Sequence, residues 1–354
     1  MEVDANMGDL YDSKMAIPDS VFDTDTDESL IPGFKEGRLP PCIKAICTKY
    51  ARVLKKSLTA DKGTAFEPAM LPIIQGAKPI RRAKTCRKTP LHWKRTLDEM
   101  IDALMKAEMI EKVHEHMGDF LFKVFFVPKP RDPTGPPRMV VHYSPLKHCF
   151  DRNLFKQSDP FTILSALKSS CRYHFVADMS TGYWQICLVD GPNGSHITSF
   201  LTEQGIFRWR VMPMGIQPAS DVLSHQMQEV FGDLFATESV SEESPMVRDL
   251  DNFLGGAETE EELEDLMEKF LSRCQSGGVY LNRSKFNIAL DGESLIFTGI
   301  QVGSEGYSMD PAHLDSIRGF QRPRTNKEFQ RWLGLCTSLG QFAASPLKDR
   351  LPLQ

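Results

Sequence analysis

One stretch, Phe175-Val-Ala-Asp-Met-Ser-Thr-Gly-Tyr-Trp-Gln-Ile-Cys-Leu188, limits what this chain can fold into more than any other. Its first residues are a short apolar run that predicts a buried strand. Asp178 follows where this strand ends, and a turn-prone Ser-Thr-Gly comes next. A single aspartate at a strand end is most often a cap or turn residue, so this stretch alone does not establish any chemistry.

A second carboxylate occupies a comparable position further along the chain. Asp251 lies within Val247-Arg-Asp-Leu-Asp-Asn-Phe-Leu254, where a tight polar turn separates apolar residues. Two hairpin aspartates that are brought together can hold a pair of Mg²⁺ ions, because this hard cation prefers oxygen ligands. Polymerases use two such ions for in-line phosphoryl transfer. A two-metal phosphoryl-transfer site is therefore our first hypothesis.

The charge of the chain is unevenly distributed. The 354 residues have a net charge of −5, but residues 1–30 hold nine acids and one lysine, which leaves the remainder mildly basic at +3. A run of eight basic residues falls within eighteen positions: Lys78, Arg81, Arg82, Lys84, Arg87, Lys88, Lys94 and Arg95. A run this dense favours contact with a polyanion, modestly, over the alternative of a solvated charged face.

Composition excludes several other classes of protein. A hydrophobic content of 41% and a charged content of 25% are typical of soluble globular proteins. The eight cysteines lack the spacing of a zinc site, so reduced thiols are expected. The acidic amino terminus has no apolar signal segment, and no long uncharged apolar run is present. We therefore expect an intracellular protein, cytoplasmic or nuclear, with no membrane partner.

The motif around Asp178 resembles the first carboxylate motif of reverse transcriptases in the Pol polyproteins of gypsy-type long-terminal-repeat retrotransposons. Asp178-Met-Ser-Thr-Gly-Tyr-Trp-Gln185 matches that motif, and Arg248-Asp-Leu-Asp-Asn252 stands where the family has a Tyr-x-Asp-Asp turn. The resemblance is collinear from about Ile73 to Phe342. It implies an α+β fold, a right-hand polymerase of fingers, palm and thumb with an antiparallel palm sheet.

The resemblance also divides the chain into regions. Residues 1–35 are expected to be an acidic disordered tail, because they are rich in Asp, Ser and Thr, and residues 36–70 a helical linker. Residues 71–170 would form the fingers with the start of the palm. Residues 171–303 would form the palm with a fingers-side insertion, and residues 304–354 the thumb.

Local patterns predict where several elements begin. Capping residues predict four helix starts: Thr89-Pro90, Thr259-Glu-Glu-Glu262, Asp310-Pro311 and Thr325-Asn-Lys-Glu328. Apolar residues at helical spacing follow each start. Two apolar runs, at 121–127 and 138–143, flank a loop rich in Gly and Pro and predict a hairpin. A further helix is expected within residues 40–62.

The resemblance assigns roles to individual residues. Asp178 and Asp251 would be the metal ligands and, with Asn252, the catalytic residues, binding Mg²⁺ or alternatively Mn²⁺. The residues expected to bind the incoming deoxynucleoside triphosphate are Lys129, Arg138, Tyr183, Met214 and Gly215. Those expected to contact an RNA or DNA template with its primer are Arg81, Arg82, Lys84, Phe297 and Gly299. Tyr183 lies five residues after Asp178, as the family's steric gate against a ribose 2′-hydroxyl does.

Lys285 has an alternative role, and Asn252 departs from the family's motif. Lys285 matches a family lysine proposed to act as a general acid toward the leaving pyrophosphate, and a surface lysine without that role is the alternative. Asn252 replaces the second aspartate of the family's turn, and Asp249 replaces its tyrosine. One electrostatic group in such a site is commonly worth about 3–4 kcal/mol, or roughly 10²–10³ in rate. Asn252 is therefore expected to impair the site.

The implied reaction is RNA-directed DNA polymerisation, in which a primer 3′-hydroxyl attacks the α-phosphorus of a deoxynucleoside triphosphate. Two alternatives remain open. The chain could be a degenerate or co-opted retroelement fragment that binds nucleic acid without polymerising, or a scaffold that binds protein and retains only the fold. Incorporation of a nucleotide separates the polymerase from the first alternative, and salt-sensitive binding to primer–template excludes the second.

Overall fold

The computed structural model describes residues 31, 37–55, 66–78, 80–81, 89, 91–113, 120–127, 138–150, 158–235, 243–339 and 342. Most of the expected acidic tail lies outside these residues. The chain divides into two compact units. Unit 1 comprises residues 1–158, 178–234 and 268–286, and unit 2 comprises residues 159–177, 235–267 and 287–354.

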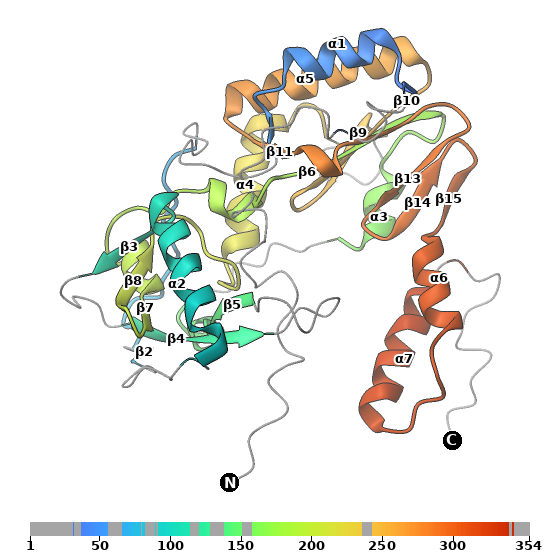
Figure 1. Cartoon of the computed structure of the whole chain (residues 1–354). Coiled ribbons are helices and arrows are strands. Elements are labelled where there is room, and N and C mark those ends of the chain that lie inside the picture. The colour runs from blue at the N-terminus through green and yellow to red at the C-terminus, as the bar shows by residue number, and fades with distance from the viewer. Residues whose placement is uncertain are drawn as a thin grey trace. The chain divides into compact units, whose positions relative to one another are not determined.

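Unit 1 contains a six-stranded sheet with a helix beside it (Figure 1). Its strands are β2 (Ile80–Arg81), β3 (Ile110–Val113), β4 (Phe120–Val127), β5 (Arg138–Val141), β7 (Phe200–Thr202) and β8 (Gly205–Trp209). The order is β2-β4-β7-β8-β3, and β5 also pairs with β4. Strands β4 and β5 are antiparallel, which confirms the predicted hairpin. Its loop lies outside the described residues.

The helix beside this sheet is α2 (Leu91–Lys106), which begins directly after the predicted Thr89-Pro90 start. Leu97, Ile101 and Leu104 are buried at the spacing of one helix face. Met105 belongs to the same helix but is 37% exposed. It follows Leu104 by one residue, and a helix rotates about 100° per residue, so its side chain leaves the buried face.

The described residues of unit 1 also include three α-helical segments and two short strands. They are α1 (Pro41–Lys49), α4 (Ala219–Phe231), the last part of α5 (Glu260–Gly277), β1 (Leu54–Lys55) and β11 (Leu281–Asn282). Helix α1 is the helix expected within residues 40–62. In α4, Leu223, Met227 and Phe231 are fully buried. The strands β1 and β11 pair in parallel.

Unit 2 contains a four-stranded sheet in the order β12-β6-β10-β9. Its strands are β6 (Tyr173–Asp178), β9 (Met246–Asp249), β10 (Asn252–Ala257) and β12 (Asn287–Ala289). The pairs β12–β6 and β9–β10 are antiparallel. This sheet confirms the antiparallel palm sheet that the resemblance implied.

Strands β6 and β10 also run in opposite directions. The Arg172 N–H donates to the Ala257 carbonyl at 2.8 Å, next to the start of β6 and at the end of β10. A Cβ on Gly255 would lie 2.2 Å from the Phe175 ring, so only glycine leaves room for that ring. From Gly255 to Ala257 in β10, the neighbouring residues run back from Phe175 to Arg172, so the two strands are antiparallel. The end of β6 therefore lies beside the start of β10.

A second sheet of unit 2 packs on the first through a shared core. Its strands are β13 (Ser294–Phe297), β14 (Ile300–Gly303) and β15 (Gly306–Met309), paired antiparallel in this order. The core cluster takes residues from both sheets and from the region of helix α3 (Pro160–Ser165): Leu164, Leu167, Val247, Leu254, Ala289, Leu295, Phe297, Ile300 and Val302.

The predicted caps begin three further helices. In α5 the Glu262 N–H donates to Thr259 Oγ1 at 3.2 Å, and Glu262 Oε2 accepts from the Glu258 N–H at 3.0 Å. Helix α6 (Pro311–Arg318) follows Asp310, and α7 (Asn326–Leu339) follows Thr325. The apolar stripe predicted for α7 is largely exposed, with Phe329 at 50% and Leu333 at 40%.

Candidate active site

Asp178 is the last residue of β6, the strand predicted from the apolar run before it. Phe175 and Ala177 are fully buried, and alternation along the strand turns the Asp178 side chain to the other face. The Asp178 side chain is 15% exposed, and Lys285 Nζ lies 2.9 Å from its Oδ1 atom. Lys285 ends the short helix η8 (Arg283–Lys285), which the Asn282 side chain caps. The structure thus joins two predicted site residues in an ion pair.

The chain turns sharply after Asp178. Thr181 has a left-handed φ of 52°, and the short helix η6 (Gly182–Gln185) follows. The fully buried Gln185 amide donates to the carbonyls of Ser180 and Tyr280, each at 2.8 Å. Its oxygen accepts from the Tyr280 N–H at 2.9 Å, and the Ser180 N–H donates to the Tyr280 carbonyl at 2.9 Å. Three of these hydrogen bonds join the turn to Tyr280, the residue that precedes β11, and the fourth closes the turn on itself.

Asp251 lies in the two-residue turn between β9 and β10, where Asp249 pairs with Asn252. Leu250, the first turn residue, has a φ of 53°. A non-glycine residue in this region costs on the order of 1–3 kcal/mol, and such strain gathers at functional sites. Arg248 supports the turn, because its Nη1 atom donates to the Leu250 carbonyl at 3.0 Å.

The turn combines a buried cation with several acceptors. Burial lowers the pKa of Arg248 to about 10, while the carboxylates of Asp249 and Asp251 favour its charged form. Arg248 is therefore cationic at neutral pH. The Asn252 Nδ2 atom donates to Asp251 Oδ1 at 3.3 Å. An amide carries no charge, so Asn252 steadies Asp251 without adding to the negative charge of the turn.

The donor set suits a divalent cation, although with few charged ligands. Mg²⁺ in enzymes is usually held by one or two carboxylates, with waters and substrate phosphates completing its shell. The sequence predicts that Asp178 and Asp251 are these two carboxylates. Within the described part of the chain, no group of three or more His, Cys, Asp or Glu side chains is placed to hold a metal ion. A metal shared by the two aspartates stays a prediction.

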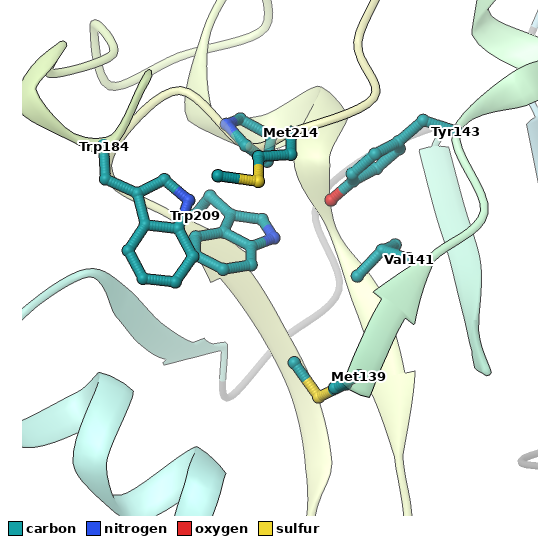
Figure 2. A pocket seen from close by; sticks show the side chains of 7 residues that line it. Met139, Val141, Tyr143, Trp184, Trp209 and Met214 are labelled. Carbon is teal, nitrogen blue, oxygen red and sulfur yellow. The ribbon is translucent and has the colours of Figure 1, made fainter. Parts of the chain in front are cut away.

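Met214, expected at the nucleotide site, lines a small cavity of about 10 Å³ in unit 1 (Figure 2). The rings of Trp184 and Trp209 in its wall lie 5.4 Å apart. Both indole nitrogens are buried, and neither has a hydrogen-bond partner among the described residues. The volume suits one water molecule, for which these nitrogens are ready donors. The cavity is far too small for a nucleobase.

Two predicted glycines occupy positions that need a left-handed backbone. Gly215 has a φ of 86°, and Gly299 has a φ of 85° in the turn between β13 and β14. A Cβ on Gly299 would meet no atom within 4 Å, so this turn is open to a close approach. Phe297, next to that turn, is fully buried in the core of unit 2. Its ring therefore supports the hairpin from the core side, and its expected role at the nucleic acid stays a prediction.

The expected phosphate-binding and template-binding cations are only partly described. Lys129, Arg82 and Lys84 lie outside the described residues. Arg81 belongs to β2, where it pairs with Leu121, and Arg138 belongs to β5, where it pairs with Val127. Tyr183 is half-buried in η6. The roles of these residues stay predictions.

Sequence reasoning missed three residues that hold the site together. Gln185 was part of the recognised motif, but its sequence position gave no sign that it would bond Tyr280. Arg248 lies close in sequence to Asp249 and Asp251, and this charge pattern was the only sign that it would support the turn. Nothing in the sequence indicated the role of Tyr280, because that role depends on its backbone N–H and carbonyl.

Comparison with known proteins identifies the fold. Residues 137–307 match the reverse transcriptase (RNA-dependent DNA polymerase) family. Over 272 residues the chain is 27% identical to the genome polyprotein of Petunia vein clearing virus (isolate Hohn), covering 74% of this chain and 12% of the polyprotein. Over 219 residues it is 24% identical to the transposon Tf2-7 polyprotein of Schizosaccharomyces pombe (strain 972 / ATCC 24843), covering 62% of this chain and 15% of that polyprotein. The chain thus spans a small part of these relatives.

Solved structures agree with this match. A foamy viral protease-reverse transcriptase in complex with double-stranded DNA has a TM-score of 0.70 at 18% identity, covering 90% of this chain and 51% of that one. The same kind of protein in complex with an RNA/DNA hybrid has a TM-score of 0.64 at 18% identity, covering 90% of this chain and 39% of that one. The chain therefore has the α+β fold of a reverse transcriptase and resembles the reverse transcriptase region of retrotransposon polyproteins. No helix in the described ranges has both the length and the apolar character that crossing a membrane requires.

Proposed function

We propose that this chain, whose residues 137–307 match the reverse transcriptase family, is an RNA-directed DNA polymerase that adds deoxynucleotides to a primer 3′ end. The observation that carries the proposal is the position of two aspartates beside the ends of neighbouring strands, β6 and β10. Asp178 ends β6, and Asp251 directly precedes β10. The antiparallel run of β6 and β10 directs both aspartates to the same end of the strand pair.

The family generally depends on divalent metal ions, and Mg²⁺ is our specific proposal here. Asp178 and Asp251 would hold it, with Mn²⁺ as an alternative. When bound, the metal lowers the pKa of the primer hydroxyl and neutralises charge on the leaving pyrophosphate. Arg248 and the Asn252 amide would keep the Asp251 carboxylate in place through the contacts described above.

Other residues of the chain would bind and order the substrates. Arg138 and Lys129 carry the positive charge that a triphosphate requires. Tyr183 would exclude the 2′-hydroxyl of a ribonucleotide by its bulk. Lys285 places its side-chain nitrogen 2.9 Å from Asp178, a position that suits a general acid toward pyrophosphate, and an ion-pair partner of Asp178 with no such role is the alternative.

One observation favours a second candidate, a degenerate copy that binds nucleic acid without polymerising. The position after Asp251 offers an amide that donates a hydrogen bond to Asp251, where the family supplies a further carboxylate. This loss of charge weakens metal binding and transition-state stabilisation together. A scaffold that binds only protein is the remaining alternative.

A primer-extension assay tests these candidates. The full chain is incubated with poly(rA)–oligo(dT) and thymidine triphosphate, first with Mg²⁺ and then with Mn²⁺. Extension in either metal supports the polymerase. Salt-sensitive binding to the primer–template without extension identifies the degenerate copy. If the chain neither binds nor extends the primer–template, the protein-binding scaffold is the remaining candidate.

A further inference from the structure

The first described helix and strand of the chain dock onto the site region of unit 1. Residues 37–55, which we call the N-terminal clamp, contain α1 and β1. The clamp buries Ile43, Cys47 and Leu54 to 1% exposure or less. Apolar side chains buried this completely contribute about 1.5–3 kcal/mol each on transfer from water, so the clamp is a packed part of the fold.

Polar contacts fix the clamp at both of its elements. After α1, the Tyr50 hydroxyl donates to Glu268 Oε1 at 2.7 Å, and Lys49 pairs with the same carboxylate. In β1, Leu54 pairs with Leu281, and the Leu281 N–H donates to the Val53 carbonyl at 2.9 Å. Each of these contacts joins the clamp to α5 or to β11.

A cation–π contact adds to this pairing. Lys55 Nζ lies 3.8 Å from the centre of the Tyr280 ring. A cation over a tyrosine face contributes about 0.5–1 kcal/mol at an exposed site. Lys55 therefore contacts the ring of Tyr280, and the backbone of Tyr280 holds the turn after Asp178.

The other edge of β11 pairs with the turn after Asp178. Leu281 forms an antiparallel bridge with Met179, the residue directly after Asp178. The Tyr280 carbonyl accepts from the Ser180 N–H at 2.9 Å. Leu281 is thus paired with the clamp on one side and with the Asp178 turn on the other. The chain then runs from β11 into η8, where Lys285 contacts Asp178.

We propose that the N-terminal clamp is a positioning element of the active site, which holds the Asp178 turn in place through β11. This inference rests on the proposed function for its catalytic meaning, because Asp178 matters as a metal ligand. Its structural content is independent of activity. β11 has only two residues, and one of its edges is occupied by β1, so loss of the clamp leaves that edge unpaired.

The test compares two full-length variants that each lose a fully buried leucine. Leu54→Ala disturbs the clamp, and the matched control Leu104→Ala disturbs α2, away from the clamp. Hydrogen–deuterium exchange at the Ser180 amide reports the turn, and the half-saturating Mg²⁺ concentration in primer extension reports the metal site. We expect Leu54→Ala to speed Ser180 exchange about tenfold relative to Leu104→Ala and to raise the half-saturating Mg²⁺ severalfold.

A milder series covers the case in which Leu54→Ala does not fold. Lys55→Ala removes the cation over Tyr280, whereas Lys55→Arg keeps a cation there. Arg52→Ala removes an exposed cation of the same segment. We expect about two- to threefold faster Ser180 exchange in Lys55→Ala, and wild-type exchange in the other two.

The outcomes separate this inference from the proposed function. If the unaltered chain extends no primer, the proposed function fails, and exchange at Ser180 still decides the clamp. If Leu54→Ala and Leu104→Ala give the same Ser180 exchange, or Lys55→Ala matches Arg52→Ala, the clamp does not position the turn, whatever the activity.

Discussion

At the scale of single residues, the proposed function predicts that Asn252 limits how well the site works. Its amide donates to Asp251 and brings no charge, so a divalent metal would meet one carboxylate fewer than in the family's turn. Restoring that charge with Asn252→Asp should raise Mg²⁺-dependent primer extension by roughly 10²–10³. The unaltered chain should extend more with Mn²⁺, which binds such ligands somewhat more tightly than the strongly hydrated Mg²⁺.

The control for this prediction is Asp178→Ala, which should abolish extension in both metals. Robust Mg²⁺ activity in the unaltered chain would refute the impairment. If Asn252→Asp gains nothing in either metal while the protein stays folded, the defect lies elsewhere and the degenerate copy becomes the better reading.

A second residue, His174 in β6, should make the fold sensitive to acid. Its side chain is 2% exposed, and its Nδ1 atom has no hydrogen-bond partner among the described residues. Burial lowers the pKa of His174 from 6.5 to about 4. Between these values the unfolded chain binds the proton that the folded chain does not, so stability falls as the pH drops from 6.5 to 4. The loss approaches about 3 kcal/mol below pH 4.

Urea unfolding of His174→Leu at pH 7.5 and pH 5 measures this effect. The variant should lose less stability on acidification than the unaltered chain, because its side chain cannot take up the proton. His225→Leu is the matched control for replacing a histidine by leucine, since His225 is 77% exposed on α4. Equal losses in the unaltered chain and His174→Leu would exclude His174 as the cause.

At the scale of elements, local chemistry predicted most of the helix starts. The caps at Thr259, Asp310 and Thr325 each precede the first residue of a helix, because a side-chain oxygen satisfies a free backbone N–H there. The pairing of β1 with β11 could not be predicted. A two-residue strand has no periodicity to read, and its partner lies far along the chain.

The two capping boxes offer a matched comparison. Thr259→Ala and Thr325→Ala each remove an oxygen that accepts an N–H at 3.2 Å. Helix α5 is packed, with Leu263, Phe270 and Cys274 fully buried, so Thr259→Ala should lower the free energy of global unfolding by about 1 kcal/mol. Helix α7 is largely exposed, so Thr325→Ala should fray its first turn with little effect on global unfolding. Urea unfolding and amide exchange distinguish the two, and equal global losses would contradict this account.

At the scale of the whole molecule, the fold followed from the order and spacing of motifs, while the site followed only in part. The turn at Asp178 and the hairpin at Asp251 both lie on the strands that the sequence predicted. The ring of Phe297 could not be placed from sequence, because alternation along β13 does not say which face meets the core. The hydrogen bonds of Gln185 and Arg248 were equally hidden, since they depend on backbone atoms brought close by folding.

The distribution of charge is the remaining property of the whole molecule with a functional consequence. The chain has a net charge of −5, yet basic residues crowd positions 78–95 while residues 1–30 are strongly acidic. If the basic run contacts phosphates, each contact releases counterions, and the salt dependence of binding grows with the number of contacts. If it is only a solvated face, the net charge alone should govern binding.

Two variants separate these explanations. The first replaces Arg81, Arg82, Lys84, Arg87 and Lys88 by glutamine. It should bind primer–template more weakly, and its slope of log K against log salt should be flatter by up to about 4. The second adds neutral replacements of five acids in residues 1–30, which returns the net charge to −5. Binding that stays weak and flat in the second variant places phosphate contacts in the run, because the overall charge is then that of the unaltered chain. Recovery of affinity and slope would mean that the run acts only through net charge.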